Sequence, residues 1–191
     1  PGASSRLIWT HHHLQIDGWS WPLLLSEVAA AYRAITVGTA PALRKPASVR
    51  DYLQWYQRAD LTASRRFWKQ YLHGFSEPTA ITAHSRGTAI VHEASASLGD
   101  EIPTQLQAHA RRLKCSLNAL VQGAWAVLIS QQSGRDDVVF GATFSGRPAD
   151  LPDVETIVGA FVNNLPVRVS IDGTSSFESL AGSLQAQAVE L

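Results

Sequence analysis

WTHHHLQIDGWSW, residues 9–21, places three consecutive histidines four residues ahead of an Asp-Gly pair. Residues 6–12 (RLIWTHH) are rich in β-branched and aromatic side chains, which predicts a strand. Because successive side chains of a strand face opposite ways, His11 and His13 are expected on one face and His12 on the other. The histidines are therefore predicted to stand at the end of a strand.

A turn and a helix are predicted directly after the histidines. Asp17 can brace a turn through hydrogen bonds or a buried ion pair, and Gly18 lets the chain reverse without Cβ hindrance. Ser20 is expected to cap a helix that ends before Gly38, and Trp19 is expected to pack in the core. The local order is therefore strand, tight turn and helix.

Three interpretations of the histidines stay open at this point. Two imidazoles at i and i+2 on one strand can chelate a metal ion, but the carboxylate comes later than in an HxHxDH hydrolase motif. In the structural interpretation, His11 and His12 are hydrogen-bonded strand residues. In the catalytic interpretation, one imidazole has a free nitrogen at an open channel and Asp17 braces its turn. The spacing alone does not decide between the last two.

Composition limits the classes of partner. The chain has 191 residues, of which 45% are hydrophobic, and its 16 basic and 16 acidic residues cancel. This balance favours neither nucleic acid nor an anionic membrane surface as a partner. Residues 117–129 are the longest apolar stretch and fall short of the roughly twenty residues that a membrane span needs. The single Cys115 fits a reducing compartment, so a cytoplasmic location is expected.

The rest of the chain predicts helices and strands in irregular order. Helices are expected at residues 49–58, 63–72, 103–114 and 117–131, the last nearly apolar and therefore central. Strands are expected at residues 89–98, 138–144 and 165–171, with a Gly146-Arg147-Pro148 turn after the second. This mixture predicts the α+β class with a mixed sheet and flanking helices.

Several motifs together resemble one protein family. The stretch HHLQIDGWS, residues 12–20, looks like the HHxxxDG motif of condensation domains from nonribosomal peptide synthetases, which share the chloramphenicol-acetyltransferase-like fold. Four later stretches resemble further segments of these domains in the family's order: DYLQW (51–55), FWKQYLHGF (67–75), DVVFGATFSGRP (137–148) and VGAFVNNLPVR (158–168). The resemblance covers nearly the whole chain.

The resemblance implies an acyltransferase-type reaction. An upstream acyl or peptidyl thioester would form an amide bond with the amine of a downstream aminoacyl thioester, both held on phosphopantetheine arms of carrier proteins near an adenylation domain. His13 falls on the family's proposed general base or amine-positioning group, while His12, Asp17 and Gly18 would support it. Ser145 and Asn163 fall in motifs that line the substrate channel. The resemblance implies no metal and no directly bound cofactor.

Condensation domains have two acyltransferase-like lobes, and this chain is expected to be a partial one because it lacks Met and opens directly on a predicted strand. Residues 1–88 are expected to end the first lobe and form the connection, and residues 89–191 to begin the second. The arginine that pairs with the motif aspartate is expected outside the chain, which would leave Asp17 unpaired or protonated. The isolated fragment is therefore expected to be poorly stable and inactive.

Three alternatives to condensation remain. Epimerisation domains share the HHxxxDG motif, although the Gly-Trp-Ser after the aspartate and the run NNLPVR, residues 163–168, favour condensation. A metal-dependent hydrolase would use the histidines as ligands. A carrier-docking module with a decayed site would have no need to keep both His13 and Asp17.

Overall fold

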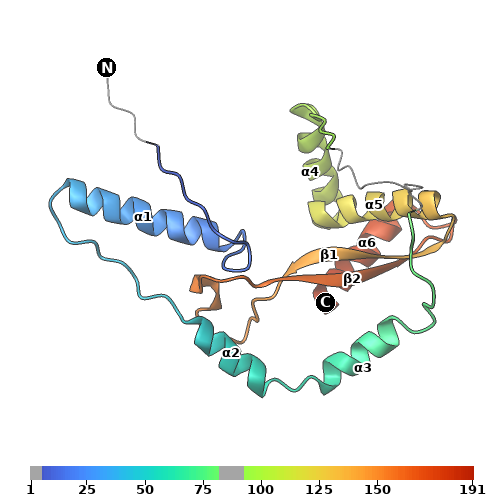
Figure 1. Ribbon diagram of the computed structural model, residues 1–191. Coiled ribbons are helices and arrows are strands. Elements are labelled where there is room, and N and C mark those ends of the chain that lie inside the picture. Colours follow the sequence, from blue (N-terminus) through green and yellow to red (C-terminus); the bar gives the residue numbers. More distant parts are fainter. Residues whose placement is uncertain (1–5, 82–92) are drawn as a thin grey trace, which may run out of the picture. The chain divides into compact units, whose positions relative to one another are not determined.

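The computed structural model describes residues 6–81 and 93–191, and the chain divides into two compact units. The first unit comprises residues up to Arg65 together with Thr143–Asn164, and the second comprises Arg66–Ala142 and Leu165–Leu191. Helices α1 (Ser20–Thr36) and α2 (Val49–Arg58) and the 3₁₀ helix η1 (Val154–Thr156) belong to the first unit. Helices α4 (Glu101–Leu113), α5 (Leu117–Ser133) and α6 (Phe177–Glu190) belong to the second. Helix α3 (Thr62–Tyr71) and strands β1 (Asp137–Ser145) and β2 (Val162–Ser170) contribute residues to both, as Figure 1 traces.

The helices predicted from hydrophobic spacing are confirmed, and local capping explains where they begin and end. The Ser48 hydroxyl and the Asp51 carboxylate form a capping box at the start of α2. The Ser116 hydroxyl accepts a hydrogen bond from Ala119 N at the start of α5, and Gly134 ends that helix with a φ of 68°. The α+β class is confirmed as well.

Two predicted strands are wrong in the part of the chain that the structure describes. Residues 6–12 have no regular secondary structure, and a turn follows at residues 13–15. Residues 93–98 are also irregular, while residues 89–92 of that prediction lie outside the described residues. A β-branched run becomes a strand only when another strand pairs with it, because strand propensity mainly reflects packing on a pleated surface.

Strands β1 and β2 form a two-stranded antiparallel sheet, and hydrogen bonds at its two ends define the register. Gly146 N donates to Phe161 O, and Ile171 N donates to Asp136 O. Between these ends, the Thr143 hydroxyl donates to Asn164 Oδ1 at 3.0 Å, which agrees with the same register. Side chains at alternate positions therefore share a face, and the face that carries Val138, Ala142, Val167 and Val169 is buried.

Helix α5 is central to the second unit, as predicted. It buries six residues and packs against α4 and α6 through a cluster that contains Ala110, Leu120 and Ala181. A Cβ at Gly123 would lie 3.1 Å from the ring of Phe177, the first residue of α6. The absence of a side chain at this position thus allows the start of α6 to approach α5 closely.

Hydrogen bonds of Arg168, a residue of β2, connect this strand to the end of α3 within the second unit. Its guanidinium donates to both carboxylate oxygens of Asp137 at 3.0 and 2.7 Å, to Tyr71 O at 3.1 Å and to His73 O at 2.8 Å. The backbone of Arg168 is also used, because its N–H donates to the Tyr71 hydroxyl and its carbonyl accepts from Gln187 Nε2. The side chains of Tyr71 and Gln187 thus form hydrogen bonds with the N–H and the carbonyl of Arg168, which pair with no strand in the described sheet.

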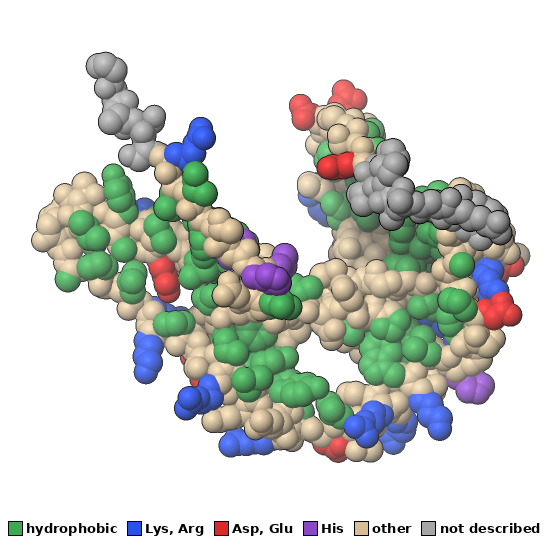
Figure 2. Space-filling model, in the orientation of Figure 1, with side chains coloured by type: hydrophobic (Ala, Val, Ile, Leu, Met, Phe, Trp, Pro, Cys, Tyr) green, Lys and Arg blue, Asp and Glu red, His purple; other side chains and the backbone are tan. Residues whose placement is uncertain are grey.

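The core of the first unit lies in the loop between β1 and β2. Val154, Ile157 and Phe161 are buried there and pack against Ala47, Tyr52 and Leu151. The long helix α1 contributes little to this core, since Ser20 is its buried residue and large apolar side chains along it are exposed. Figure 2 shows apolar side chains and a group of histidines at the surface of this unit.

No single helix among residues 6–81 and 93–191 has the length and apolar character needed to cross a membrane. Helices α4 and α5, bent by 100° at their junction, meet those criteria only as a pair.

Candidate active site

The histidines lie in an irregular segment that leads into a turn. His13 is exposed in the turn at residues 13–15, and His12 is also exposed. Local hydrogen bonds shape this turn: Leu14 N donates to His12 Nδ1 at 3.1 Å, and Gln15 N donates to His12 O. The imidazole of His12 thus accepts a hydrogen bond from the backbone of its own turn, whereas the side chain of His13 is exposed to solvent.

His11 packs against two tryptophans instead of sharing a strand face with His13. Its ring centroid lies 5.8 Å from that of Trp9 and 4.6 Å from that of Trp21, and the two indoles are 4.7 Å apart. Aromatic packing of this kind holds rings in fixed relative positions. The paired strand face predicted for His11 and His13 is therefore wrong, and His11 has a packing role.

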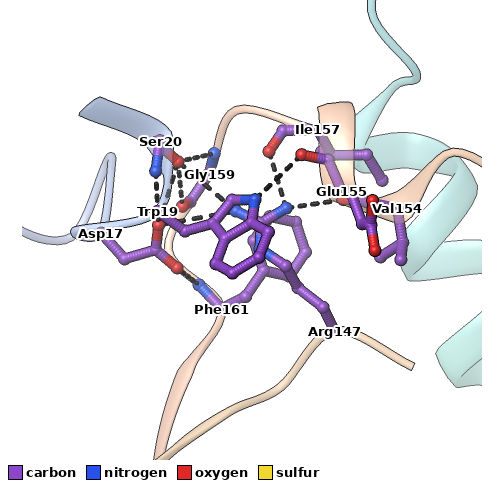
Figure 3. A network of polar contacts seen from close by, with 9 residues as sticks. All are labelled: Asp17, Trp19, Ser20, Arg147, Val154, Glu155, Ile157, Gly159 and Phe161. Carbon is purple, nitrogen blue, oxygen red and sulfur yellow. Dashed lines mark hydrogen bonds and ion pairs between the residues drawn. The ribbon is translucent and has the colours of Figure 1, made fainter. Parts of the chain in front are cut away.

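Asp17 is the buried anchor of the segment after the histidine turn. It is 3% exposed, and its two carboxylate oxygens accept hydrogen bonds from different parts of the first unit. Oδ1 accepts from Ser20 N at 3.1 Å and from the Ser20 hydroxyl at 3.0 Å, and Oδ2 accepts from Phe161 N at 3.0 Å. Figure 3 shows these contacts joining the start of α1 to the loop before β2.

Asp17 also has an arginine partner inside the chain, which corrects the expectation that it would be unpaired. Arg147 Nη2 lies 3.5 Å from Asp17 Oδ1, and both side chains are 4% exposed. Arg147 Nη1 donates to Val154 O at 2.6 Å and to Ile157 O at 2.8 Å. A buried guanidinium is thereby matched by one carboxylate and two carbonyls, which reduces the cost of removing both charges from water.

The pKa of Asp17 lies below its ordinary value. Burial alone would raise this pKa, but hydrogen bonds from Phe161 N and from the hydroxyl and N–H of Ser20, together with the Arg147 charge, outweigh burial. Burial lowers the pKa of Arg147, and the attraction of Asp17 opposes that change. Asp17 is therefore an ionised carboxylate near neutral pH, as a turn brace requires, and it does not act as a proton donor there.

Ser20 has a different role from the one that the sequence suggested. It is the first residue of α1 rather than its cap, and it is 0% exposed. Its hydroxyl lies 2.9 Å from Gly159 O and accepts from Gly159 N at 3.0 Å. The capping function belongs to Asp17, whose carboxylate accepts from Ser20 N.

Two glycines whose steric role the sequence reasoning did not predict allow the close contacts of this site. A Cβ at Gly146 would lie 2.4 Å from Phe161 O, and a Cβ at Gly159 would lie 2.7 Å from the Phe161 ring. By contrast, a Cβ at Gly18 would meet nothing within 4 Å, and Gly18 has no positive φ. The steric reason expected for glycine at position 18 is therefore wrong. A Gly-Arg pair after a strand was the available signal for position 146.

Ser145 and Asn163 lie close in sequence to this network but face different sides of the sheet. Both are exposed; Ser145 precedes Arg147 by two residues, and Asn163 follows Phe161 by two. In the register set by Gly146 and Phe161, Ser145 shares a face with Thr143 and Asn164, whereas Asn163 shares a face with Phe144. The two candidate channel residues therefore point away from one another.

The arrangement suits proton transfer or hydrogen bonding by an exposed imidazole held on an anchored turn. Across residues 6–81 and 93–191, no group of three His, Cys, Asp or Glu side chains lies close enough together to hold a metal ion. His84 and His92 lie outside the described residues. The described residues thus include an exposed imidazole at His13 and a buried ion pair between Asp17 and Arg147.

Comparison with known proteins points to one family. The family model described as Condensation domain matches residues 3–191. A linear gramicidin synthase protein of Brevibacillus parabrevis is 41% identical over an alignment of 191 residues that covers 95% of this chain and 4% of that protein. Chondramide synthase cmdD of Chondromyces crocatus is 37% identical over an alignment of 188 residues that covers 97% of this chain and 5% of that protein.

Solved structures give the same fold. The first condensation domain of the CDA synthetase superimposes with a TM-score of 0.77 at 23% identity, over 94% of this chain and 41% of that one. The X-domain from teicoplanin biosynthesis superimposes with a TM-score of 0.72 at 26% identity, over 94% of this chain and 42% of that one. The chain thus spans a small part of the curated relatives and less than half of these solved chains.

Proposed function

The chain belongs to the condensation-domain family, and from this premise we propose that it takes part in peptide bond formation in nonribosomal peptide synthesis. The observation that carries the proposal is the exposure of His13 on a turn that is followed by Asp17, which is buried and held by hydrogen bonds and an ion pair. An acid–base group must be both accessible and fixed, and this pair of properties meets that requirement.

In the proposed reaction, the amine of an aminoacyl thioester attacks the carbonyl carbon of an acyl or peptidyl thioester. A C–N bond forms, the C–S bond breaks, the amine loses a proton, and the phosphopantetheine thiol leaves protonated. The imidazole of His13 accepts the amine proton or holds the amine by a hydrogen bond. General base catalysis contributes roughly 10²- to 10⁴-fold in rate, whereas fixing two reactants together contributes about 7–11 kcal/mol.

The other residues have supporting parts in this proposal. His12 shapes the turn through Leu14 N, and Asp17 anchors it through Ser20, Phe161 and Arg147. Asp17 is not a catalytic residue, because its oxygens are occupied by these groups and it is buried. Ser145 and Asn163 remain the proposed channel residues, and because they lie on opposite faces of the sheet, a passage along one face contacts one of them directly.

The proposed partners are the phosphopantetheine arms of upstream and downstream carrier proteins and a neighbouring adenylation domain. The names of the relatives support a setting in nonribosomal synthesis, because linear gramicidin synthase and bacitracin synthase 1 are among them. The reaction as written needs no metal, nucleic acid or membrane. A cytoplasmic location is proposed on the basis of the single Cys115.

The test uses the complete condensation domain that contains this chain, with donor and acceptor carriers loaded. His13→Ala is expected to lower peptide formation by about 10²- to 10⁴-fold. His73→Ala, a change at another exposed histidine, is the matched control and is expected to leave the rate unchanged. Wild-type peptide formation by His13→Ala would reject the role of His13.

The same preparation separates condensation from epimerisation. An epimerase exchanges the α-proton of one carrier-bound residue with solvent and needs no acceptor. Condensation predicts a new amide bond with both carriers and no α-proton exchange when only one loaded carrier is present. Exchange in deuterated water without an acceptor would identify an epimerase instead.

A further inference from the structure

Carbonyl oxygens of the short helix η1 and of Ile157, the residue after it, accept hydrogen bonds from two side chains outside the helix. Arg147 Nη1 donates to Val154 O at 2.6 Å and to Ile157 O at 2.8 Å. Trp19 Nε1 donates to Glu155 O at 3.0 Å. A 3₁₀ helix of three residues leaves most of its carbonyls without internal partners, so these donors fix its position.

Trp19 is not a core residue, which corrects the sequence expectation, since it is 52% exposed. Its ring nevertheless contacts the buried part of the site: the Arg147 guanidinium carbon lies 5.8 Å from the Trp19 ring centroid and 4.2 Å from that of Phe161. Guanidinium groups at such distances from aromatic rings are attracted by the ring quadrupole. One face of Trp19 thus adjoins the ion pair while the rest of the side chain is open to solvent.

Residues 17–20 are attached to the loop 147–161 through three of their side chains. Asp17 binds Phe161 N and pairs with Arg147, Ser20 binds Gly159, and Trp19 binds Glu155 O (Figure 3). The attachments at Gly159 and Phe161 lie close together near the end of the loop, and Arg147 binds Asp17 from its beginning. The bond at Glu155 O lies between these positions in sequence, and it is the attachment that Trp19 supplies.

We propose that Trp19 is a positioning residue that holds the histidine turn in its working orientation, acting through Glu155 O and the Arg147–Asp17 pair. The turn carries His13 four residues before Asp17, so a change in the position of residues 17–20 would displace the imidazole. Trp19 does not touch the reacting groups in this inference. The inference rests on the proposed function, because it assigns Trp19 an effect on the reaction that His13 assists.

The chain offers a matched control for the test. Trp55 Nε1 donates to Asp150 Oδ2 at 3.0 Å, the same length as the Trp19 bond, in the same unit but outside this network. Trp55→Phe and Trp19→Phe therefore each remove one indole hydrogen bond and keep an aromatic ring. The acceptor is a carboxylate for Trp55 and a backbone carbonyl for Trp19, so the control matches the donor that is lost and the ring that remains.

The experiment compares Trp19→Phe, Trp19→Ala and Trp55→Phe in the complete domain with loaded carriers. Removal of one hydrogen bond is expected to lower kcat for Trp19→Phe by about two- to tenfold, with the KM for loaded carriers unchanged. Trp19→Ala, which also removes the ring from Arg147, is expected to lose more. Trp55→Phe is expected to keep the wild-type kcat, and the melting temperatures of the two Phe variants are expected to be similar.

Two outcomes overturn the inference. The first is a kcat for Trp19→Phe equal to that of Trp55→Phe, and the second is a loss of activity that matches the loss of folded protein measured by circular dichroism. His13→Ala, assayed in parallel, separates the two proposals. Full activity of His13→Ala rejects the proposed role of His13 and this inference together, whereas an inactive His13→Ala with a normal Trp19→Phe rejects the inference alone.

Discussion

Asp17 links local sequence to the architecture of the first unit. Its carboxylate is bound on one side by the start of α1 and on the other by Phe161 N and Arg147, which are more than a hundred residues away along the chain. A buried carboxylate with so many partners stabilises one geometry strongly, because removing it leaves buried donors without acceptors. The histidine turn ends two residues before this anchor.

Acid titration of Asp17 gives a testable stability change. Its folded-state pKa is lowered, so its contribution is complete above the unfolded-state pKa of about 3.9 and is lost as pH falls through the folded-state pKa. Asp17→Asn in the complete domain is expected to cost about 3–5 kcal/mol of unfolding free energy at pH 7. The difference from wild type should shrink below about pH 4. Urea unfolding between pH 3 and pH 7 measures this, and a difference independent of pH would contradict it.

Ser145 and Asn163 are predicted to affect catalysis separately. They lie on opposite faces of the sheet, so one substrate passage along one face contacts one of them directly. Ser145→Ala and Asn163→Ala are expected to differ in their effect on KM for a loaded carrier, with one near wild type. Thr143→Ala, which shares the face of Ser145, serves as the control. Equal KM changes in both variants would argue against this assignment.

Sequence reasoning could name candidate residues of the site but not the bonds between them. His13 and Asp17 were predictable because they are neighbours in one motif. The Arg147 partner was not, since no local pattern connects positions 130 residues apart, even though Gly146-Arg147-Pro148 was recognised as a turn. Trp19 was assigned to the core because large aromatics usually are, and its hydrogen bond to Glu155 O had no signal in the sequence.

At the scale of elements, helices followed their local signals more closely than strands did. Helices α2 and α5 have side-chain caps close to the hydrophobic spacing that predicts them, so their ends are encoded nearby. The β-branched residues of β1 predicted a strand, and the strand forms because it pairs with β2. Residues 6–12 have similar composition but no strand partner in the described structure, and they remain irregular.

The close approach of the two strand ends at Gly146 gives a prediction at this scale. Gly146→Ala places a methyl group 2.4 Å from Phe161 O, a backbone atom that cannot move without disturbing the Asp17 contact at Phe161 N. The expected cost is about 1–3 kcal/mol of unfolding free energy. Gly141→Ala in β1, where a Cβ meets nothing within 4 Å, is the control. Thermal unfolding of the complete domain compares them, and equal melting temperatures would contradict the prediction.

At the scale of the whole chain, much apolar surface is exposed. Helix α1 carries Leu25, Val28, Tyr32 and Ile35 at helical spacing, and these residues are between 49% and 72% exposed. Helix α5 likewise exposes Val121, Trp125 and Leu128. Contiguous apolar surface of this kind favours association with other apolar surfaces.

The 191-residue polypeptide, expressed by itself, is therefore expected to bind a hydrophobic dye and to self-associate. Replacing Tyr32 and Ile35 by glutamate should reduce both effects, because it interrupts the stripe on α1. Light scattering with size exclusion and dye fluorescence measure the two effects. A monomer that binds no dye would contradict this prediction.

The central claim is that His13, held by the Asp17 anchor, assists the step in which the amine attacks the thioester. The most direct measurement is the single-turnover rate of peptide formation, by rapid quench, with both carriers loaded in advance. We expect the rate constant of His13→Ala to fall by about 10²- to 10⁴-fold while His73→Ala matches wild type. A single-turnover rate constant for His13→Ala equal to that of wild type would contradict the claim.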